Sequence, residues 1–136
     1  MPNHWIGIVS REHVRRGVEG GFAMLNHGKL PPLKRLKPGD WLIYYSPKTA
    51  IDGEPLKAFT AIGAIAGRVP YQAEMAAGTA GWRRDVDWQA ANETPIAALT
   101  DRLAFTQGNW GLLARRGRFP IEDGDFTVIR DAMRAA

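Results

Sequence analysis

The feature that most constrains the fold is a run of five apolar residues, Trp41 to Tyr45, enclosed by two turn-forming segments. The preceding Lys37-Pro38-Gly39-Asp40 is typical of a tight turn, because Pro fixes φ at its second position and Gly accepts positive φ at its third. The run is too short for a helix and rich in β-forming residues, so it predicts a buried strand. Residues 46–55, which contain two Pro and one Gly, predict a loop.

Two further strands and one helix are indicated around this run. Residues 56–69 form a long β-prone segment whose many small residues suit tight curvature or a close ligand. Residues 4–9 predict a first strand. Ser10 is a natural N-cap for a helix over 11–19, and Gly20-Gly21 ends that helix because Gly accepts the left-handed conformation of a helix C-terminus. Residues 21–29 predict an irregular stretch.

The remaining segments of the sequence predict a linker, a strand and two helices. Pro31-Pro32 predicts an extended linker. Residues 71–75 indicate another strand and residues 95–103 a short helix. A C-terminal amphipathic helix is predicted by the spacing of its apolar residues, Phe126, Ile129 and Met133.

Residues 82–88 alternate, as a strand does when its side chains point to opposite faces. One face carries Trp82, Arg84, Val86 and Trp88; the other carries Arg83, Asp85 and Asp87. Tyr44 and Tyr45 likewise point to opposite faces of their strand.

Several strands, few helices and no regular βαβ alternation predict an α+β fold with a curved or barrel-like sheet. A chain of 136 residues is one domain on ordinary length statistics, so we expect a single domain over residues 1–136.

Composition narrows the class of protein. The chain has no Cys, which excludes disulfides and thiolate metal sites, and no apolar stretch long enough to span a membrane. We therefore expect a cytoplasmic protein. Lys and Arg number 18 against 14 Asp and Glu, giving a net charge of +4, which fits a polyanionic partner such as nucleic acid.

Motifs of common enzyme classes are absent from the sequence. There is no phosphate-binding loop, no dinucleotide fingerprint and no nucleophile elbow, and the three His do not follow a metalloprotease pattern. We therefore expect no catalysis, no metal and no cofactor. Two alternatives stay open: an enzyme that acts on a nucleotide or modified RNA with a carboxylate such as Asp85 as base, and a sensor of small metabolites.

Aromatic residues beside basic ones suggest a binding site for a base. Phe22 and Trp82 each follow Gly in a segment where no regular face demands a large ring, so either could be the wall of a cage. Trp110 could be a further wall or a surface anchor. Basic residues next to these rings could neutralise phosphates. The candidate phosphate contacts are Lys29, Arg83, Arg84, Arg115 and Arg116.

Several motifs resemble the EVE domain family. The resemblance rests on four stretches in the family's order and spacing, which together cover essentially the whole chain. They are Trp5 to Ala23, Lys37 to Pro47, Phe59 to Gly63, and Trp110-Gly111 with Arg116-Gly117.

The resemblance implies a PUA-like pseudobarrel with flanking helices, related to the YTH readers of methylated adenine. It implies a non-catalytic module that binds a modified base in DNA or RNA, with modified cytosine the expected ligand. It also implies a pocket lined by Ser10, Phe22, Asn26, Lys29, Tyr44, Ser46 and Trp82. YTH relatives have Trp where this chain has Phe22, so any cage here has a smaller wall.

The resulting hypothesis is specific. A base leaves its stack and enters between Phe22 and Trp82, while Ser10 and Asn26 read its edge. Whether the target is DNA or RNA, which modification is preferred and whether the domain dimerises are not encoded in recognisable motifs.

Overall fold

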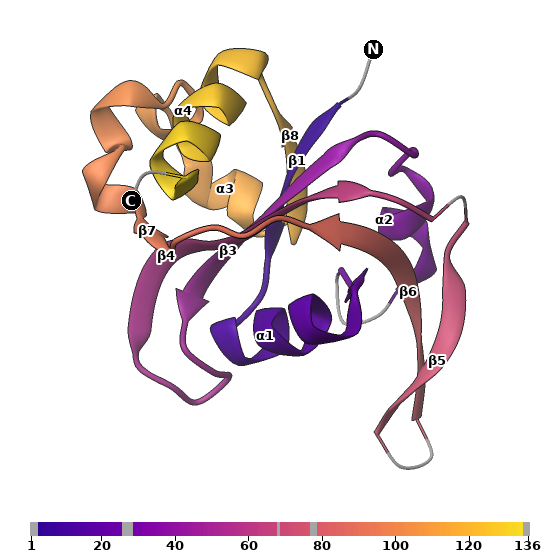
Figure 1. Ribbon diagram of the computed structural model, residues 1–136. Coiled ribbons are helices and arrows are strands. Elements are labelled where there is room, and N and C mark those ends of the chain that lie inside the picture. Colours follow the sequence, from indigo (N-terminus) through magenta and orange to yellow (C-terminus); the bar gives the residue numbers. More distant parts are fainter. Residues whose placement is uncertain (1–2, 26–28, 68, 77–78, 135–136) are drawn as a thin grey trace.

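A computed structural model describes residues 3–25, 29–67, 69–76 and 79–134. Its strands belong to one curled sheet in the order β2-β6-β4-β3-β1-β8, with β5 pairing to β6 and β7 to β4 (Figure 1). The strands are β1 His4–Ile8, β2 Phe22–Ala23, β3 Trp41–Lys48, β4 Pro55–Ile65, β5 Tyr71–Ala76, β6 Thr79–Trp88, β7 Thr94–Pro95 and β8 Arg118–Ile121. The helices are α1 Arg11–Gly20, α2 Leu30–Lys34, α3 Trp110–Ala114 and α4 Asp123–Arg134. The predicted α+β class and curved sheet are confirmed.

The predicted buried strand is β3, at the centre of the sheet. It pairs in parallel with β1 and antiparallel with β4. The turn before it forms as predicted: Gly39 has φ 89°, and the backbone N–H of Asp40 donates to the carbonyl of Lys37 at 2.9 Å. The buried carboxylate of Asp40 accepts hydrogen bonds from Trp5 Nε1 and the backbone N–H of Lys37, which fixes the turn against β1.

Each face of the sheet carries its own core. Tyr45 and Ile43 pack with residues of α4, including Phe126 and Ile129. Tyr44 packs on the other face with Val14 of α1 and with Leu33 and Leu36 from α2 and its C-terminal side. The opposite orientation predicted for Tyr44 and Tyr45 is therefore confirmed. Figure 1 shows α3 and α4 on one side of the sheet and α1 on the other.

Helix α1 forms as its caps predict. The Ser10 hydroxyl accepts a hydrogen bond from the backbone N–H of His13 at 3.4 Å. Gly21, at φ 75°, ends the helix, and its N–H donates to the carbonyl of Gly17. The amphipathic C-terminal helix is confirmed as α4, which buries Phe126, Ile129 and Met133.

Four sequence predictions need correction. Pro31 and Pro32 lie in the first turn of α2, where a missing N–H leaves no helical hydrogen bond unmade. Residues 95–103 form the end of β7 and short 3₁₀ turns instead of an α-helix. Residues 46–48 continue β3, so the loop is only a tight hairpin before β4. Phe22 lies in β2, because the backbone after α1 pairs with β6.

Candidate functional site

A hollow of about 480 Å³ opens where β1 runs into α1. This volume lies within the range of ligand pockets, roughly 300–1,000 Å³. The C-terminal end of β1, the end of β3, the following hairpin and the loop before β8 all contribute to it. Its apolar walls are Ile8, Val9, Met24, Pro47, Ala50 and Ala114, and the highly exposed Ile51 stands at its rim. Its polar side chains are Ser10, His13, Lys48 and Arg115.

Ser10 lies at this hollow, and its role as N-cap leaves its hydroxyl proton available. The oxygen accepts from His13 N, while the O–H can still donate to a ligand. A helix N-terminus leaves its first N–H groups without helical partners, but here the chain itself supplies acceptors for them. Glu12 N donates to the carbonyl of Thr49 at 2.9 Å, and Val14 N donates to the carbonyl of Ser10. Oxygen atoms of the chain itself thus accept hydrogen bonds from most of the N–H groups at this helix terminus.

Tyr44 is not a pocket wall, because its side chain is 1% exposed. Its hydroxyl donates to the carbonyl of Met24 at 2.8 Å and accepts from the N–H of the same residue. Its ring stacks on Trp88 with centroids 5.2 Å apart. Burial raises the pKa of Tyr44, and the hydrogen bond with Met24 only partly opposes that rise.

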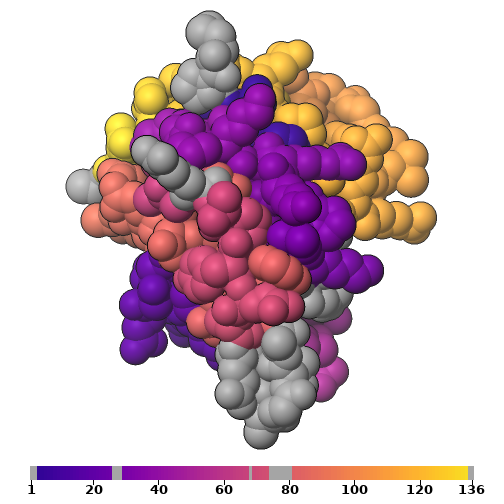
Figure 2. All heavy atoms as spheres, turned by 90° about the vertical axis from the view of Figure 1, so that its right-hand side faces the viewer, coloured from indigo at the N-terminus to yellow at the C-terminus, as the bar shows by residue number. Residues whose placement is uncertain are grey.

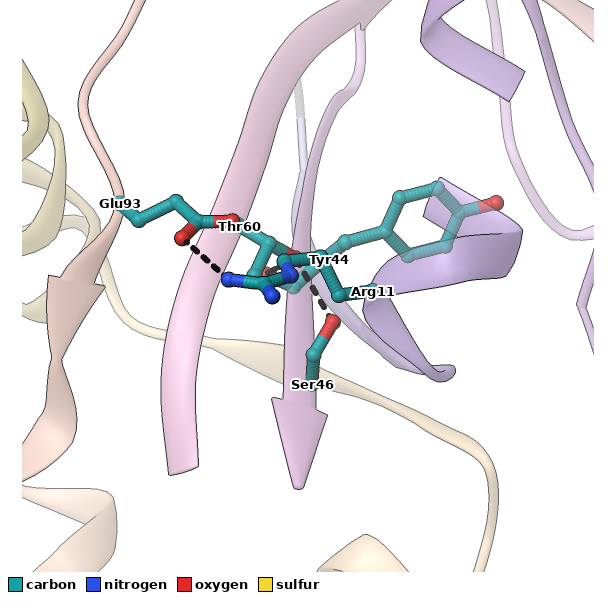
Figure 3. A network of polar contacts seen from close by, with 5 residues as sticks. All are labelled: Arg11, Tyr44, Ser46, Thr60 and Glu93. Carbon is teal, nitrogen blue, oxygen red and sulfur yellow. Dashed lines mark hydrogen bonds and ion pairs between the residues drawn. The ribbon is translucent and has the colours of Figure 1, made fainter. Parts of the chain in front are cut away.

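Ser46 is also interior. It is fully buried, and its hydroxyl shares a 2.8 Å hydrogen bond with that of Thr60 on β4. Figure 3 shows this pair with Arg11, which reaches from α1 toward Glu93 and forms an ion pair of 3.2 Å. These contacts connect α1 to the sheet and to the segment before β7, so the expected placement of Ser46 in the pocket is corrected to a structural role.

Phe22 and Trp82 lie on opposite faces of β6 and cannot sandwich one base. Phe22 pairs with Asp85, so it shares the face of Asp85 and Arg83, and the Arg83 guanidinium lies 3.9 Å from the Phe22 ring centroid. Trp82 points to the other face, as the predicted alternation of residues 82–88 requires, and packs against the core. The cage prediction is wrong because no local pattern indicates that Phe22 pairs with β6 in this register.

Trp82 borders a second, separate hollow of about 480 Å³. This hollow lies between α2 and β6, and its other walls include Leu30, Pro38 and Pro70. Its rim carries Lys34 and Lys37. Ser10 is not among the residues that line it, so the structure separates two features that the sequence hypothesis joined in one pocket.

Arg84 has a structural role. The side chain is 1% exposed and donates to the carbonyls of Gly67, Leu33 and Leu36 at 2.8, 2.9 and 2.6 Å. These bonds connect β6 to α2 and to the segment after β4. A guanidinium held in this way does not face solvent, so the expected phosphate contact at Arg84 is corrected.

Three other candidate cations remain on the surface. Arg115 and Arg116 are exposed between α3 and β8, and Arg115 borders the hollow beside Ser10. Lys29 is exposed at the N-cap of α2. The phosphate role predicted for these three residues is compatible with their exposure.

Trp110 belongs to the core beneath α3. Its ring packs edge-on against Tyr45 and Phe105, with centroids 5.3 and 5.8 Å away. Trp110 is therefore neither a cage wall nor an exposed anchor. Asn26 lies outside the described residues.

Sequence reasoning missed the residues that join the hollow from other elements. His13 could have been predicted, because the third residue after an N-cap lies on the same side of the first helical turn as the cap residue Ser10. Lys48 and Met24 gave no local signal, because only the pairing of β3 and the path of the chain after β2 bring them to Ser10.

The basic run Arg115, Arg116 and Arg118 was visible in the sequence, but no role in the site was predicted for Arg118. The Arg118 guanidinium lies 5.8 Å from the Trp5 ring centroid, and its buried Nε has no hydrogen-bond partner among the described residues. Burial lowers the pKa of Arg118, and the positive charges of Arg35 and Arg116 lower it further. Figure 2 shows the purple segment that contains α2 beside the orange-to-gold segment that leads into β8.

The described residues also bear on metal sites and membrane spans. Within these residues, no three His, Asp or Glu side chains gather closely enough to hold a metal ion. No helix in the described part of the chain is long and apolar enough to cross a bilayer.

Comparison with known proteins identifies the family. The model of the EVE domain matches residues 3–132. The chain belongs to the EVE-domain family. Close relatives of this EVE domain include the UPF0310 protein msl3206 of Mesorhizobium japonicum, 50% identical across 99% of this chain and 94% of the relative. The UPF0310 protein YdcG of Bacillus subtilis is 44% identical across 96% and 92% of the two chains. These names state no catalytic activity.

Solved structures confirm the fold. Rpa0253 from Rhodopseudomonas palustris, determined by NMR, superposes on this EVE domain with a TM-score of 0.61 at 16% identity. The match covers 96% of this chain and 92% of that one. The crystal structure of Atu2648 from Agrobacterium tumefaciens gives a TM-score of 0.58 at 13% identity, over 98% and 94% of the two chains. At such low identity these similarities concern the fold alone.

Proposed function

We propose that this EVE domain is a binding module that takes one modified nucleobase of DNA or RNA into the hollow beside Ser10. Modified cytosine is the ligand we propose first, because the family resemblance implies it. The observation that carries the proposal is the hollow itself, whose walls are mainly apolar and whose edge holds a free hydroxyl proton and two cations. No catalytic step is proposed.

The binding step follows from the lining residues. A base that leaves its stack loses a few kcal/mol of stacking and pairing. The hydroxyl of Ser10 can donate a hydrogen bond to the edge of the base, and His13 lines the same hollow. A methyl group on the base would fill apolar space beside Ile8 or Met24, and one methyl gives only about 1–3 kcal/mol of discrimination. The selectivity for the modified base should therefore be modest.

Phosphates would contact the cations around the opening. Lys48 and Arg115 border the hollow, and Arg116 follows directly in the chain. Arg118 of β8 lies within electrostatic range of Arg116 and of Arg35 at the C-terminus of α2, so positive charge continues from the opening toward α2. Each phosphate neutralised by such a residue releases counterions, so affinity should fall as salt rises.

The test is a titration with free 5-methyl-2′-deoxycytidine and with oligonucleotides that carry it, beside unmodified controls. Calorimetry suits the measurement, because no Trp occurs among the described residues that line the hollow. Binding of modified oligonucleotides that weakens with salt supports the proposal. Response to the free nucleoside alone supports a metabolite sensor, and product formation over time supports an enzyme.

The enzyme alternative that used Asp85 gains no support from its surroundings. Asp85 is exposed on the outer face of β6 and accepts a hydrogen bond of 2.9 Å from the Tyr71 hydroxyl. It is not among the residues that line the hollow beside Ser10.

A variant at Ser10 distinguishes its role as the N-cap of α1 from its proposed role in binding the base. Asn caps helices about as well as Ser, but its larger side chain should occupy part of the hollow. We expect Ser10→Asn to bind the modified oligonucleotide at least tenfold more weakly, with an unfolding free energy within about 0.5 kcal/mol of wild type. Undiminished binding by a folded Ser10→Asn protein would place the base elsewhere.

A further inference from the structure

An exposed isoleucine stands at the edge of the proposed base pocket. Ile51 lies at the tip of the β3–β4 hairpin with 83% of its surface exposed. The other exposed large apolar residues range from Tyr71 at 39% to Val69 at 69%. An apolar side chain that projects this far contributes almost nothing to the core, and what distinguishes Ile51 from other exposed apolar residues is its place at the rim of the proposed pocket.

The backbone that carries Ile51 is well ordered by hydrogen bonds. Thr49 and Glu54 close the hairpin through backbone and side-chain bonds of 3.0 and 3.1 Å, and Gly53 N donates to the carbonyl of Ala50. The carbonyl of Thr49 also accepts from Glu12 N, which connects the tip to α1. A Cβ on Gly53 would collide with Thr49 Oγ1 and Ala50 N, so the turn is tightly packed.

The position of Ile51 relates it to the pocket. Together with Ser10, His13 and Ala50, it borders both the proposed base pocket and an adjoining hollow of about 360 Å³, and it is the most exposed of the large apolar residues there. Lys48 and Arg115 border one side of this edge, whereas on the other side Arg16 is ion-paired with Glu12 at 2.6 Å and Asp52 adds a carboxylate. A phosphate beside an inserted side chain would therefore find positive charge on the side of Lys48 and Arg115.

We propose that Ile51 is a wedge that enters a nucleic-acid duplex at the position that the flipped base leaves. Proteins that unstack base steps frequently insert apolar side chains into the gap. A wedge lowers the cost of extruding a base from a duplex, but it gives nothing to a free nucleoside or an unpaired strand. The inference rests on the proposed function and adds that paired nucleic acid is a substrate of the same site.

The experiment compares three probes: free 5-methyl-2′-deoxycytidine, a single strand containing that base, and the corresponding duplex. Ile51→Ala should bind the duplex about tenfold more weakly, while its affinities for the nucleoside and single strand stay within about twofold of wild type. Ile51→Met should restore most of the duplex affinity, because Met is also apolar and long enough to insert. Val69→Ala is the matched control, an exposed apolar residue that does not border the hollow beside Ser10.

The outcomes separate the two proposals. Equal losses for all three probes would make Ile51 an ordinary pocket wall and overturn the wedge, as would a duplex affinity unaffected by Ile51→Ala. Binding of single strands but not duplexes by the wild type would overturn the wedge and leave the base pocket standing. If the wild type binds none of the probes, the proposed function itself fails.

Discussion

Arg84 and Arg115 are both guanidinium side chains that the sequence assigned to phosphate, yet their surroundings differ completely. Arg84 is buried and donates to the carbonyls of three residues in two different segments. Arg115 is exposed at the edge of the hollow. At the residue scale, hydrogen bonds to the backbone decide which basic groups build the protein and which can reach a ligand.

Replacing Arg84 should therefore affect stability. Arg84→Met removes the buried side-chain donor from the carbonyls of Gly67, Leu33 and Leu36, and we expect it to lower the unfolding free energy by about 3 kcal/mol. Arg115→Gln should change stability by less than about 0.5 kcal/mol and weaken nucleic-acid binding instead. Urea denaturation measures the first effect. Equal stabilities for the two variants would contradict the structural role of Arg84.

The burial of Tyr44 leads to a second prediction at the residue scale, which concerns how stability depends on pH. Burial raises the pKa of Tyr44 in the folded protein, so the unfolded state loses this proton first as pH rises. The contribution of Tyr44 is fully present below its unfolded pKa of about 10 and is lost progressively at higher pH. Tyr44→Phe should thus be less sensitive to a change from pH 9 to pH 11 than wild type.

The same variant has a second expected effect at neutral pH. Tyr44→Phe removes the partner of both Met24 N and Met24 O, which should cost about 1–3 kcal/mol of unfolding free energy. Denaturant titrations give the unfolding free energies of wild type and Tyr44→Phe at neutral pH, pH 9 and pH 11. An identical pH response in wild type and variant would show that Tyr44 does not cause the alkaline loss of stability.

At the scale of elements, β4 and β6 approach closely enough to require Gly. A Cβ on Gly63 would lie 2.7 Å from Val86 Cγ1 and 2.8 Å from both Asp87 O and Trp88 Cε3. Two of these neighbours are a backbone oxygen and a ring atom, neither of which moves easily. The small residues of β4, which suggested curvature or a nearby ligand, here permit the close approach of another strand.

Two Gly→Ala variants should consequently have opposite effects. Gly63→Ala should lower the unfolding free energy by about 1–3 kcal/mol through overpacking. Gly124→Ala in α4 meets nothing within 4 Å and should raise it by about 0.4–1 kcal/mol, because Ala restricts the unfolded chain. Thermal denaturation of both variants checks the signs. A destabilising Gly124→Ala or a neutral Gly63→Ala would contradict the packing at that position.

On the scale of the whole molecule, the curled sheet collects residues distant in sequence at one opening. Ser10, Lys48 and Arg115 come from three parts of the chain, and the pairing of β1 with both β3 and β8 brings them together. This pairing converts a modest net charge of +4 into positive charge around one hollow. Local charge of this kind, more than the total, determines where a polyanion binds.

The salt dependence of binding should report these contacts one by one. For each phosphate contact removed, the slope of log K against log salt should become shallower by about 0.9 for duplex DNA or 0.7 for a single strand. We expect such a change for Lys48→Gln and for Arg115→Gln, and none for Arg102→Gln, whose exposed charge lies in a 3₁₀ turn outside the hollow. An unchanged slope in the first two variants would remove them from the interface.

The sequence by itself determined the local elements with strong chemical signals. The Lys37 to Asp40 turn, the buried strand after it, the Ser10 cap, the Gly21 helix end and the alternation of residues 82–88 all depend on neighbours within a few residues. Backbone sterics and capping bonds act at that range, so a single sequence reveals them. The family resemblance then supplied the class of fold.

Only the tertiary structure decided which residues share a site. The register of β2 against β6 placed Phe22 and Trp82 on opposite faces, and no local pattern encodes a register between distant strands. Packing buried Tyr44, Ser46 and Arg84, while the hairpin and the loop before β8 brought Ile51 and Arg115 to the Ser10 hollow. Such placements depend on contacts between segments far apart in the chain, which is why the elements with strong local signals were predictable and the pocket was not.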